Sequence, residues 1–314
     1  MIQTQCAQPF TAASHQDKSF APDDPQKSPR DIEEMWEDFI AQRSVEFRSQ
    51  GQELSNIFRL PLGYLDEKQD YRIVVWHNIY SDEADPDIHW VEGSLVEVYT
   101  LTPWGVFPIS AYSSLDEMSI DASLSGRDIN GDGLPEIILS GFKGGNGWGC
   151  EYIQIFQILP DGEMKELKID HSSELAPKEL KDLNKDGIYE IIAINTHWEM
   201  EFDLCHACSP GVWGVYVWQD GKYIDGSKKF PQFYDHAIAK LESHLSDLTN
   251  DPGDRQFYMG AVISILLNYI QKGEAVQGWA RFKTLTDRPE FHNKESVRWI
   301  QEIKNDITNY YKGK

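Results

Sequence analysis

The sequence contains no apolar run long enough to cross a membrane, and it is poor in basic side chains. A transmembrane helix needs about 20 apolar residues, whereas the longest mainly aliphatic stretch is the short segment 261–267. The chain has 29 Lys and Arg against 51 Asp and Glu, so its formal net charge is -22. Such a surface repels the phosphates of nucleic acids and of anionic membranes. We therefore expect no transmembrane segment and no nucleic-acid partner, and we expect cations as small partners.

Motifs that indicate an enzyme are also missing. The chain has neither a Gly-x-Ser-x-Gly nucleophile motif nor a His-Glu-x-x-His zinc motif. The glycine-rich segment 144–149 leads into a predicted strand rather than a helix, so no helix N-terminus is available to bind a phosphate. Nucleophilic hydrolase, zinc hydrolase and nucleotide-binding functions therefore have no positive support.

The sequence has only four cysteines, Cys6, Cys150, Cys205 and Cys208. Cys205 and Cys208 have the C-x-x-C spacing of redox and zinc sites, but no βαβ pattern and no second C-x-x-C accompany them. If the protein is exported, a disulfide from Cys150 to Cys205 or Cys208 is the favoured interpretation.

Residues 1–27 are predicted to form a flexible tail, because they are rich in Gln, Ser, Asp and Pro. Residues 1–5 are too few to hold the apolar part of a signal peptide. A cysteine followed by a polar linker is similar to the start of a mature bacterial lipoprotein. Cys6 is therefore a candidate lipid anchor, and the expected location is the periplasm or the cell surface. A disordered cytosolic tail is the alternative, and with it a cytoplasmic location stays open.

The rest of the chain divides into a helical segment at 28–59, a β region at 60–230 and a helical domain at 231–314. Ser28 and Pro29 are expected to begin the first helix, and Gly51 to end it. Short β-branched and aromatic segments predict strands at 71–76, 95–101, 136–139, 152–158, 190–194 and 212–218. Apolar residues at helical spacing predict helices at 237–248 with Asp235 as its cap, at 257–270 ended by Gly273, at 275–285 and at 297–310.

Most of the acidity lies in the β region, where two segments repeat. Residues 61–230 contain 30 Asp and Glu against 12 Lys and Arg. The segment 128–139, with the sequence Asp-Ile-Asn-Gly-Asp-Gly-Leu-Pro-Glu-Ile-Ile-Leu, matches the segment 182–193. Each copy continues into another strand and a glycine turn, and a degraded copy covers 64–75. Repeats made only of strands predict propeller-like blades or stacked antiparallel sheets.

The repeated segments have the pattern of a calcium loop. Calcium takes about 6–8 oxygen ligands, and a curled loop turns alternate side chains toward one point. An EF-hand requires Glu at position 12 of the loop, where this chain has Leu139 and Ala193, and the closing acid comes instead at position 9 before a strand. The expected ligands of two calcium ions are Asp128, Asn130, Asp132, the Leu134 carbonyl and Glu136, and Asp182, Asn184, Asp186, the Ile188 carbonyl and Glu190.

These loops resemble the FG-GAP repeats of integrin α-chains and the related VCBS repeats of bacterial surface proteins. The family pattern is Asp-x-Asp/Asn-x-Asp-Gly-x-x-Asp followed by an aliphatic residue, and here Glu136 and Glu190 replace the closing Asp. The resemblance implies calcium binding by the residues named above and a propeller-like β fold. Family propellers usually have seven blades, and this chain has three copies. The expected fold is therefore mainly β with α: three repeats forming an open or partial propeller, followed by a helical domain.

The first copy lacks the expected ligands. Aligned with the second copy, Lys68 takes the place of Asp132 and Arg72 takes the place of Glu136. We predict that this loop binds no metal and that Asp66 and Asp70 pair with the two cations.

Trp148 and Trp198 are candidate ligand-binding residues, because each follows the first strand of its repeat near glycine-rich or acidic residues. The sequence favours a calcium-binding, non-enzymatic protein that binds or scaffolds a protein or glycan partner outside the cytoplasm. The alternative is a glycan-active hydrolase or lyase with Glu199 or Glu201 as acid/base, or a glycan-binding module that uses Trp148 and Trp198.

Overall fold

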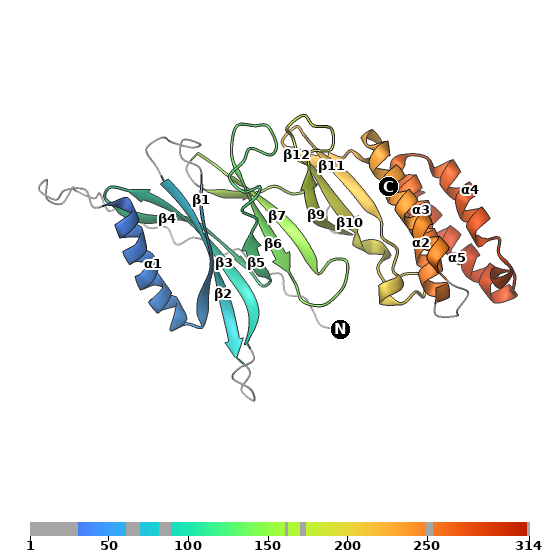
Figure 1. The fold of residues 1–314 in the computed structure, drawn as a ribbon, viewed down its shortest axis with the longest axis horizontal. Coiled ribbons are helices and arrows are strands. Elements are labelled where there is room, and N and C mark those ends of the chain that lie inside the picture. The colour runs from blue at the N-terminus through green and yellow to red at the C-terminus, as the bar shows by residue number, and fades with distance from the viewer. Residues whose placement is uncertain are drawn as a thin grey trace, which may run out of the picture.

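The computed structural model describes residues 31–60, 70–81, 89–160, 163–169, 174–248 and 254–312. Within these residues the chain forms three four-stranded antiparallel sheets that follow one another along the molecule, with helices at both ends (Figure 1). The expected mixture of a mainly β region and helices is confirmed, and the sheets do not close into a ring.

The elements follow the chain in a simple order. Helix α1 (Ile32–Arg48) precedes sheet 1, which contains β1 (Gln52–Arg59), β2 (Asp70–Ser81), β3 (His89–Thr102) and β4 (Gly105–Ser114). Sheet 2 contains β5 (Glu117–Ile120), β6 (Glu136–Phe142), β7 (Glu151–Ile158) and β8 (Met164–Glu166). Sheet 3 contains β9 (Leu175–Lys181), β10 (Glu190–Asn195), β11 (Trp213–Gln219) and β12 (Lys222–Asp225). The helical end contains α2 (Pro231–Asp247), α3 (Asp254–Lys272), α4 (Ala275–Thr286) and α5 (Lys294–Lys312).

Each sheet is an up-and-down meander in which neighbouring strands are also neighbours in sequence. The six strands predicted from the sequence all fall on the two central strands of a sheet, namely β2, β3, β6, β7, β10 and β11. The edge strands were missed because they alternate or are short, whereas central strands carry the continuous apolar pattern of segments that are buried on both faces. One of the missed edge strands is β1, which lies inside the range 28–59 that was expected to be helical.

The central strands supply side chains to two cores at once. On β2, Ile73 and Val75 enter a core that lies between sheets 1 and 2, whereas Val74 and Trp76 enter a core under α1. On β6, Ile137 faces the first of these cores, while Ile138 joins a third core between sheets 2 and 3. Because successive side chains of a strand point to opposite faces, this alternation means that the sheets are stacked face to face.

Helix α1 covers the outer face of sheet 1. The helix begins after Asp31, whose carboxylate accepts the N–H of Glu33 at 2.9 Å, while the expected start at Ser28 and Pro29 lies outside the described residues. Trp36 packs against the ring of Tyr99 at 6.0 Å between centroids. Beneath the helix, the buried Glu97 carboxylate accepts hydrogen bonds from a tryptophan, a tyrosine and an arginine: Trp76 Nε1 at 2.9 Å, Tyr99 Oη at 2.5 Å and Arg43 Nη2 at 2.8 Å. Three donors offset the cost of burying the charge.

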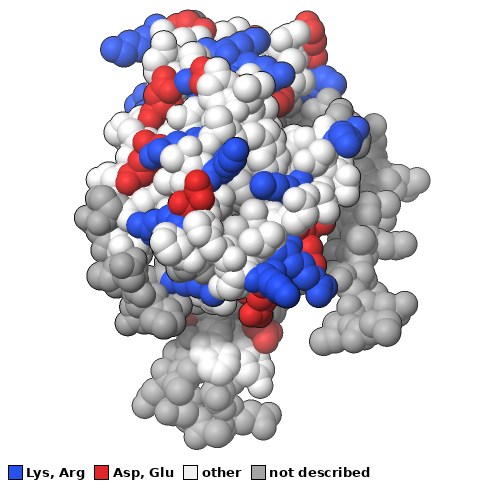
Figure 2. All heavy atoms as spheres, turned by 90° about the vertical axis from the view of Figure 1, so that its right-hand side faces the viewer, with Lys and Arg blue, Asp and Glu red and all other residues white. Residues whose placement is uncertain are grey.

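The four helices α2–α5 cover the other end of the stack beyond sheet 3 (Figure 1). Helix α2 begins at Pro231 and not at an Asp235 cap as expected. Asp235 lies one turn inside the helix, where its carboxylate accepts a hydrogen bond from Lys272 Nζ of α3 at 2.6 Å. Residues 231–314 contain 11 Lys and Arg against 11 Asp and Glu. Figure 2 shows basic and acidic side chains interspersed on this face. Most of the net negative charge of the protein therefore lies in the β region, residues 61–230.

Replacing Trp36 with Ala should lower the free energy of unfolding by about 3–5 kcal/mol, because the side chain is only 5% exposed and its removal leaves a cavity over sheet 1. Urea denaturation followed by circular dichroism measures this change. On the same helix, Val45→Ala is the matched control. Val45 is 72% exposed, so its replacement should change stability by less than about 0.5 kcal/mol.

Candidate functional site: two acidic loops and an aromatic cleft

The two acidic segments occupy corresponding places in neighbouring sheets. The first lies between β5 and β6, and the second lies between β9 and β10. Glu136 and Glu190 are the first residues of β6 and β10. The sequence repeat therefore corresponds to a structural repeat, with each acidic loop preceding a buried central strand.

The backbone takes the same course in both loops. At the fourth position of the motif, Gly131 and Lys185 have φ of 77° and 63°. At the sixth position, Gly133 and Gly187 have φ of 90° and 89°. This left-handed region favours glycine. A side chain at the fourth position is accommodated once, by Lys185, whereas both loops keep glycine at the sixth.

The first aspartate of each motif organises its loop by accepting backbone hydrogen bonds. Asp128 accepts the N–H groups of Gly131 at 2.7 Å, Asp132 at 3.1 Å and Gly133 at 2.9 Å. Asp182 accepts those of Asp186 at 3.1 Å and Gly187 at 3.0 Å. The loops therefore hold their curled shape through the acids at position 1, as Asx-type turns do.

The closing glutamates are buried and face the other acids of their loops. Glu136 is fully buried and accepts the N–H of Ile129 at 2.8 Å. Its burial, together with the nearby charges of Asp132 and Asp128, raises the pKa of Glu136 to about 8, although the Ile129 N–H opposes the shift.

Glu190 is the counterpart of Glu136 in the second loop. It is also buried, and it accepts the N–H of Leu183 at 2.8 Å. Burial is the largest cause that raises the pKa of Glu190, and Asp186 and Asp182 add to it. Each loop thus has a desolvated carboxyl group beside further carboxylates, an arrangement that a cation or a proton stabilises.

The two loops contact each other. The N–H of Tyr189 donates to the carbonyl of Ile129 at 2.8 Å. A Cβ atom built on Gly131 would lie 3.2 Å from Cδ1 of Ile188, so glycine allows the second loop to approach closely. The two loops therefore pack directly against each other.

The donor set of each loop consists of oxygens, as a hard cation requires. Among the described residues, no three side chains of the types His, Cys, Asp and Glu are grouped closely enough to hold a metal by themselves. An asparagine side chain and a backbone carbonyl are part of the expected sets, so the fit depends on ligands beyond these four types. In the first loop, Asp132 Oδ2 and Glu136 Oε1 both accept a hydrogen bond from Gln157 Nε2, at 2.5 and 3.4 Å. Two acid oxygens therefore converge on one positively polarised amide group.

The loops differ at the strand opposite the closing acid. Gln157 on β7 pairs directly with Glu136. In sheet 3, the register that pairs Ile191 with Tyr216 places Val217 opposite Glu190. The valine side chain has no hydrogen-bond donor or acceptor. The second loop therefore lacks a counterpart of the Gln157 amide, which bridges two acids in the first loop.

The degraded first copy contains an ion pair in place of acidic ligands. Arg72 Nη2 lies 2.9 Å from Asp70 Oδ2 and 2.8 Å from Glu33 Oε1 of α1. The expected pairing of Asp70 with a cation is therefore observed, while Asp66 and Lys68 lie outside the described residues.

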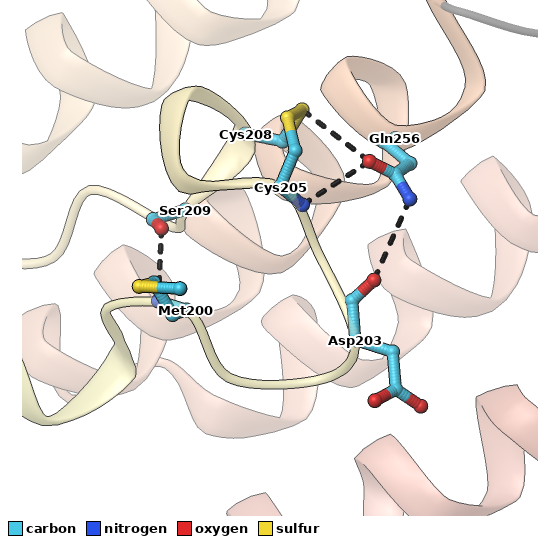
Figure 3. The surroundings of a disulfide bond; sticks show 6 residues. All are labelled: Met200, Asp203, Cys205, Cys208, Ser209 and Gln256. Carbon is cyan, nitrogen blue, oxygen red and sulfur yellow. Dashed lines mark hydrogen bonds between the residues drawn. A yellow bond between two sulfur atoms is a disulfide. The ribbon is translucent and has the colours of Figure 1, made fainter.

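The structure joins Cys205 to Cys208 in a disulfide. The expected disulfide from Cys150 to one of these two residues is therefore wrong. Among the described cysteines, Cys150 keeps a free thiol. The C-x-x-C segment forms a 3-10 turn in which the two sulfurs are already neighbours, so the local link needs no distant partner. Gln256 of α3 lies beside this turn, and its Oε1 accepts the N–H of Cys205 at 3.1 Å (Figure 3).

The loop before the disulfide has an unusual backbone. Met200, Phe202 and Asp203 have φ of 60°, 63° and 55°, a region in which side chains are disfavoured. The surrounding structure holds this conformation: Ser209 Oγ accepts the N–H of Met200 at 2.9 Å (Figure 3), and Trp299 Nε1 donates to the carbonyl of Phe202 at 2.8 Å. Backbone strain of this kind occurs often at binding sites.

Glu199 links this loop to the glycine-rich loop between β6 and β7. Its Oε1 accepts the N–H of Trp148 at 2.9 Å and lies 3.1 Å from Nε2 of His206. Glu201 is exposed. The structure therefore places Glu199 in a contact between two loops.

Trp148 and Trp198 have opposite environments. Trp148 is 37% exposed, whereas Trp198 is 1% exposed and stacks on Phe202 within the core of the helical end. The expectation that Trp198 offers a face to a ligand is therefore wrong, because the helices pack over it.

Trp148 borders a cleft of about 500 Å³ between the disulfide loop, sheet 3 and helices α2 and α3. Trp213, Phe233 and Phe257 add three more aromatic side chains to its lining. The sequence analysis did not identify these residues, because they come from a strand and two helices that are brought together only by the fold. The sole signal in the sequence was the tryptophan in the glycine-rich loop.

Comparison of the chain with known protein families, with curated proteins and with solved structures finds no match. Within the described residues, every helix is too short or too polar to qualify as a membrane span.

Replacing Glu199 with Ala should release the Trp148 loop and lower the free energy of unfolding by about 1 kcal/mol, because the Trp148 N–H and His206 lose a shared acceptor. Amide hydrogen exchange at residues 144–149 should become faster. Glu201→Ala removes a neighbouring exposed acid and should leave both measurements unchanged. Equal protection in Glu199→Ala and the unmodified protein would contradict the linking role.

Proposed function

We propose that this protein is a calcium-stabilised β-repeat protein without enzymatic activity, and that it binds or scaffolds a partner outside the cytoplasm. The observation that carries the proposal is that two loops with the same acids and the same left-handed glycine occupy equivalent places in adjacent sheets and contact each other. A turn without a bound ion does not require matching acids at positions 1, 5 and 9 and a matching asparagine at position 3. Under this proposal, the chain is a distant relative of the FG-GAP and VCBS repeat proteins.

The hydrogen bonds of the acidic loops support the proposal. Asp128 and Asp182 shape their loops through backbone hydrogen bonds. A carboxylate oxygen has more than one lone pair, so these bonds leave acceptor capacity for a metal. Glu136 and Glu190 anchor the loops to central strands. Bound calcium would supply positive charge that neutralises the clustered acids.

The consequence of binding is mechanical as well as electrostatic. Because the loops contact each other between sheets 2 and 3, ordering them fixes the position of one sheet on the next. Extracellular calcium modules have Kd values of about 10⁻⁴–10⁻³ M, which suits a compartment that is rich in calcium. The same location is consistent with a Cys205–Cys208 disulfide. The candidate lipid anchor Cys6 lies outside the described residues.

Calcium at 100 times its Kd should raise the free energy of unfolding by about 2.7 kcal/mol for each site. Isothermal titration calorimetry should count two ions per chain, since the loop of the first copy has cations in place of two acids. Adding a chelator should reverse the stabilisation that thermal denaturation measures.

Two single variants assign the sites. Asp128→Asn should abolish one of the two binding events, and Asp182→Asn should abolish the other. Asp220→Asn is the matched control, because it removes the same charge from the turn between β11 and β12. The absence of any heat of binding, together with a melting temperature that millimolar calcium leaves unchanged, would overturn the proposal.

A further inference from the structure

The cleft beside Trp148 has two chemically different sides. On one side, four aromatic side chains belong to its lining: Trp148, Trp213, Phe233 and Phe257. We propose that the cleft binds a small amphiphile that has a flat apolar body and one anionic group. The volume of about 500 Å³ falls within the range of sites for small organic molecules. This inference concerns a different part of the molecule from the calcium loops and does not depend on them.

Part of the aromatic lining is exposed to solvent, and a bound ligand would bury it. Trp148 is 37% exposed and Phe257 is 42% exposed, whereas Trp76 and Trp198 in the cores are almost fully buried. Trp148 comes from the loop between β6 and β7, Trp213 from β11, and Phe233 and Phe257 from α2 and α3. A flat apolar molecule placed among them would bury aromatic surface on several sides, which is the dominant favourable contribution to binding in such sites.

Hydrogen bonds hold the walls of the cleft in place. Glu199 fixes the backbone of Trp148. The N–H of Gly211 donates to Ser264 Oγ at 2.9 Å, and Asn268 Nδ2 donates to the Gly211 carbonyl at 3.0 Å.

The disulfide turn also meets α3 without a gap. A Cβ atom on Gly260 would lie 1.9 Å from the carbonyl oxygen of Cys208, so only glycine permits this approach. Because the walls of the cleft are already fixed, little conformational entropy is lost in ordering them when a ligand binds.

The basic groups of the lining are concentrated on one helix. His236, Lys240 and His244 are spaced by four residues on α2, so they follow one face of the helix. Lys240 offers an ammonium group, and the two imidazoles can donate hydrogen bonds. Glu179 on β9 is the one acid among the described lining residues. A single polar edge beside an apolar body matches an amphiphile, whereas a sugar carries hydroxyl groups around its whole ring.

The charge of the rest of the protein makes this edge selective. The net charge of -22 opposes the approach of an anion to most of the surface. An anion is therefore expected to bind where cationic and donor groups are concentrated, and α2 provides them beside the aromatic lining.

The test compares two dyes that share the same rings. The anionic probe is 1-anilinonaphthalene-8-sulfonate, and the neutral probe is N-phenyl-1-naphthylamine, which lacks the sulfonate. Fluorescence titration of the full chain should show saturable binding of one sulfonate dye per chain. Lys240→Gln should weaken binding of the sulfonate dye about tenfold, because a charge-assisted hydrogen bond is lost. The same variant should weaken binding of the neutral dye less than twofold. Trp148→Ala should weaken both dyes about tenfold, because it removes part of the apolar lining.

Two controls keep the test decisive. Lys283→Gln removes an exposed lysine on α4 that does not line the cleft, and it should change neither affinity. If Trp148→Ala fails to fold by circular dichroism, Phe257→Ala replaces it, because that side chain is already largely exposed. Unsaturable binding would overturn the site. If Lys240→Gln weakens the binding of both dyes equally, or leaves the binding of both unchanged, the assignment of an anionic group is overturned.

Discussion

The architecture depends on the burial of both faces of the central strands. Ile73 and Val74 are adjacent on β2, yet they enter different cores, and Ile137 and Ile138 do the same on β6. A sheet of this kind cannot be stable alone, because each face needs another layer. The stack must therefore be covered at both ends, and the helices cover it: α1 over sheet 1, and α2–α5 beyond sheet 3 (Figure 1). Covered ends also explain why three sheets need not close into a ring.

The same stacking brings the acidic loops together. Each loop precedes a central strand, and adjacent sheets place corresponding loops side by side, so that Tyr189 bonds to Ile129. Acids from two loops then lie on one border of the stack, and the cost of burying Glu136 and Glu190 must be met there by cations or by polar donors. Gln157 supplies such a donor to the first loop. The acidity of the sheets and their order along the molecule are therefore parts of one arrangement.

The border between sheets and helices serves a different purpose. Here the chain uses a local disulfide, a left-handed segment at Met200, Phe202 and Asp203, and a carboxylate contact from Glu199 to hold irregular loops against α3. These features position the exposed Trp148 over a cleft rather than inside a core. The cleft therefore combines irregular loops with side chains of β11, α2 and α3.

The sequence by itself determined the central strands, the four C-terminal helices, the two acidic loops and the pairing of Asp70 with a cation. All of these depend on short-range patterns: apolar periodicity, turn residues and alternating acids. Tertiary structure decided the edge strands, the Cys205–Cys208 pairing, the burial of Trp198 and the lining of the cleft by Trp213 and Phe257. These properties depend on which distant segments become neighbours. An exposed tryptophan and a buried one have the same local pattern, and only the helices packed over sheet 3 distinguish them.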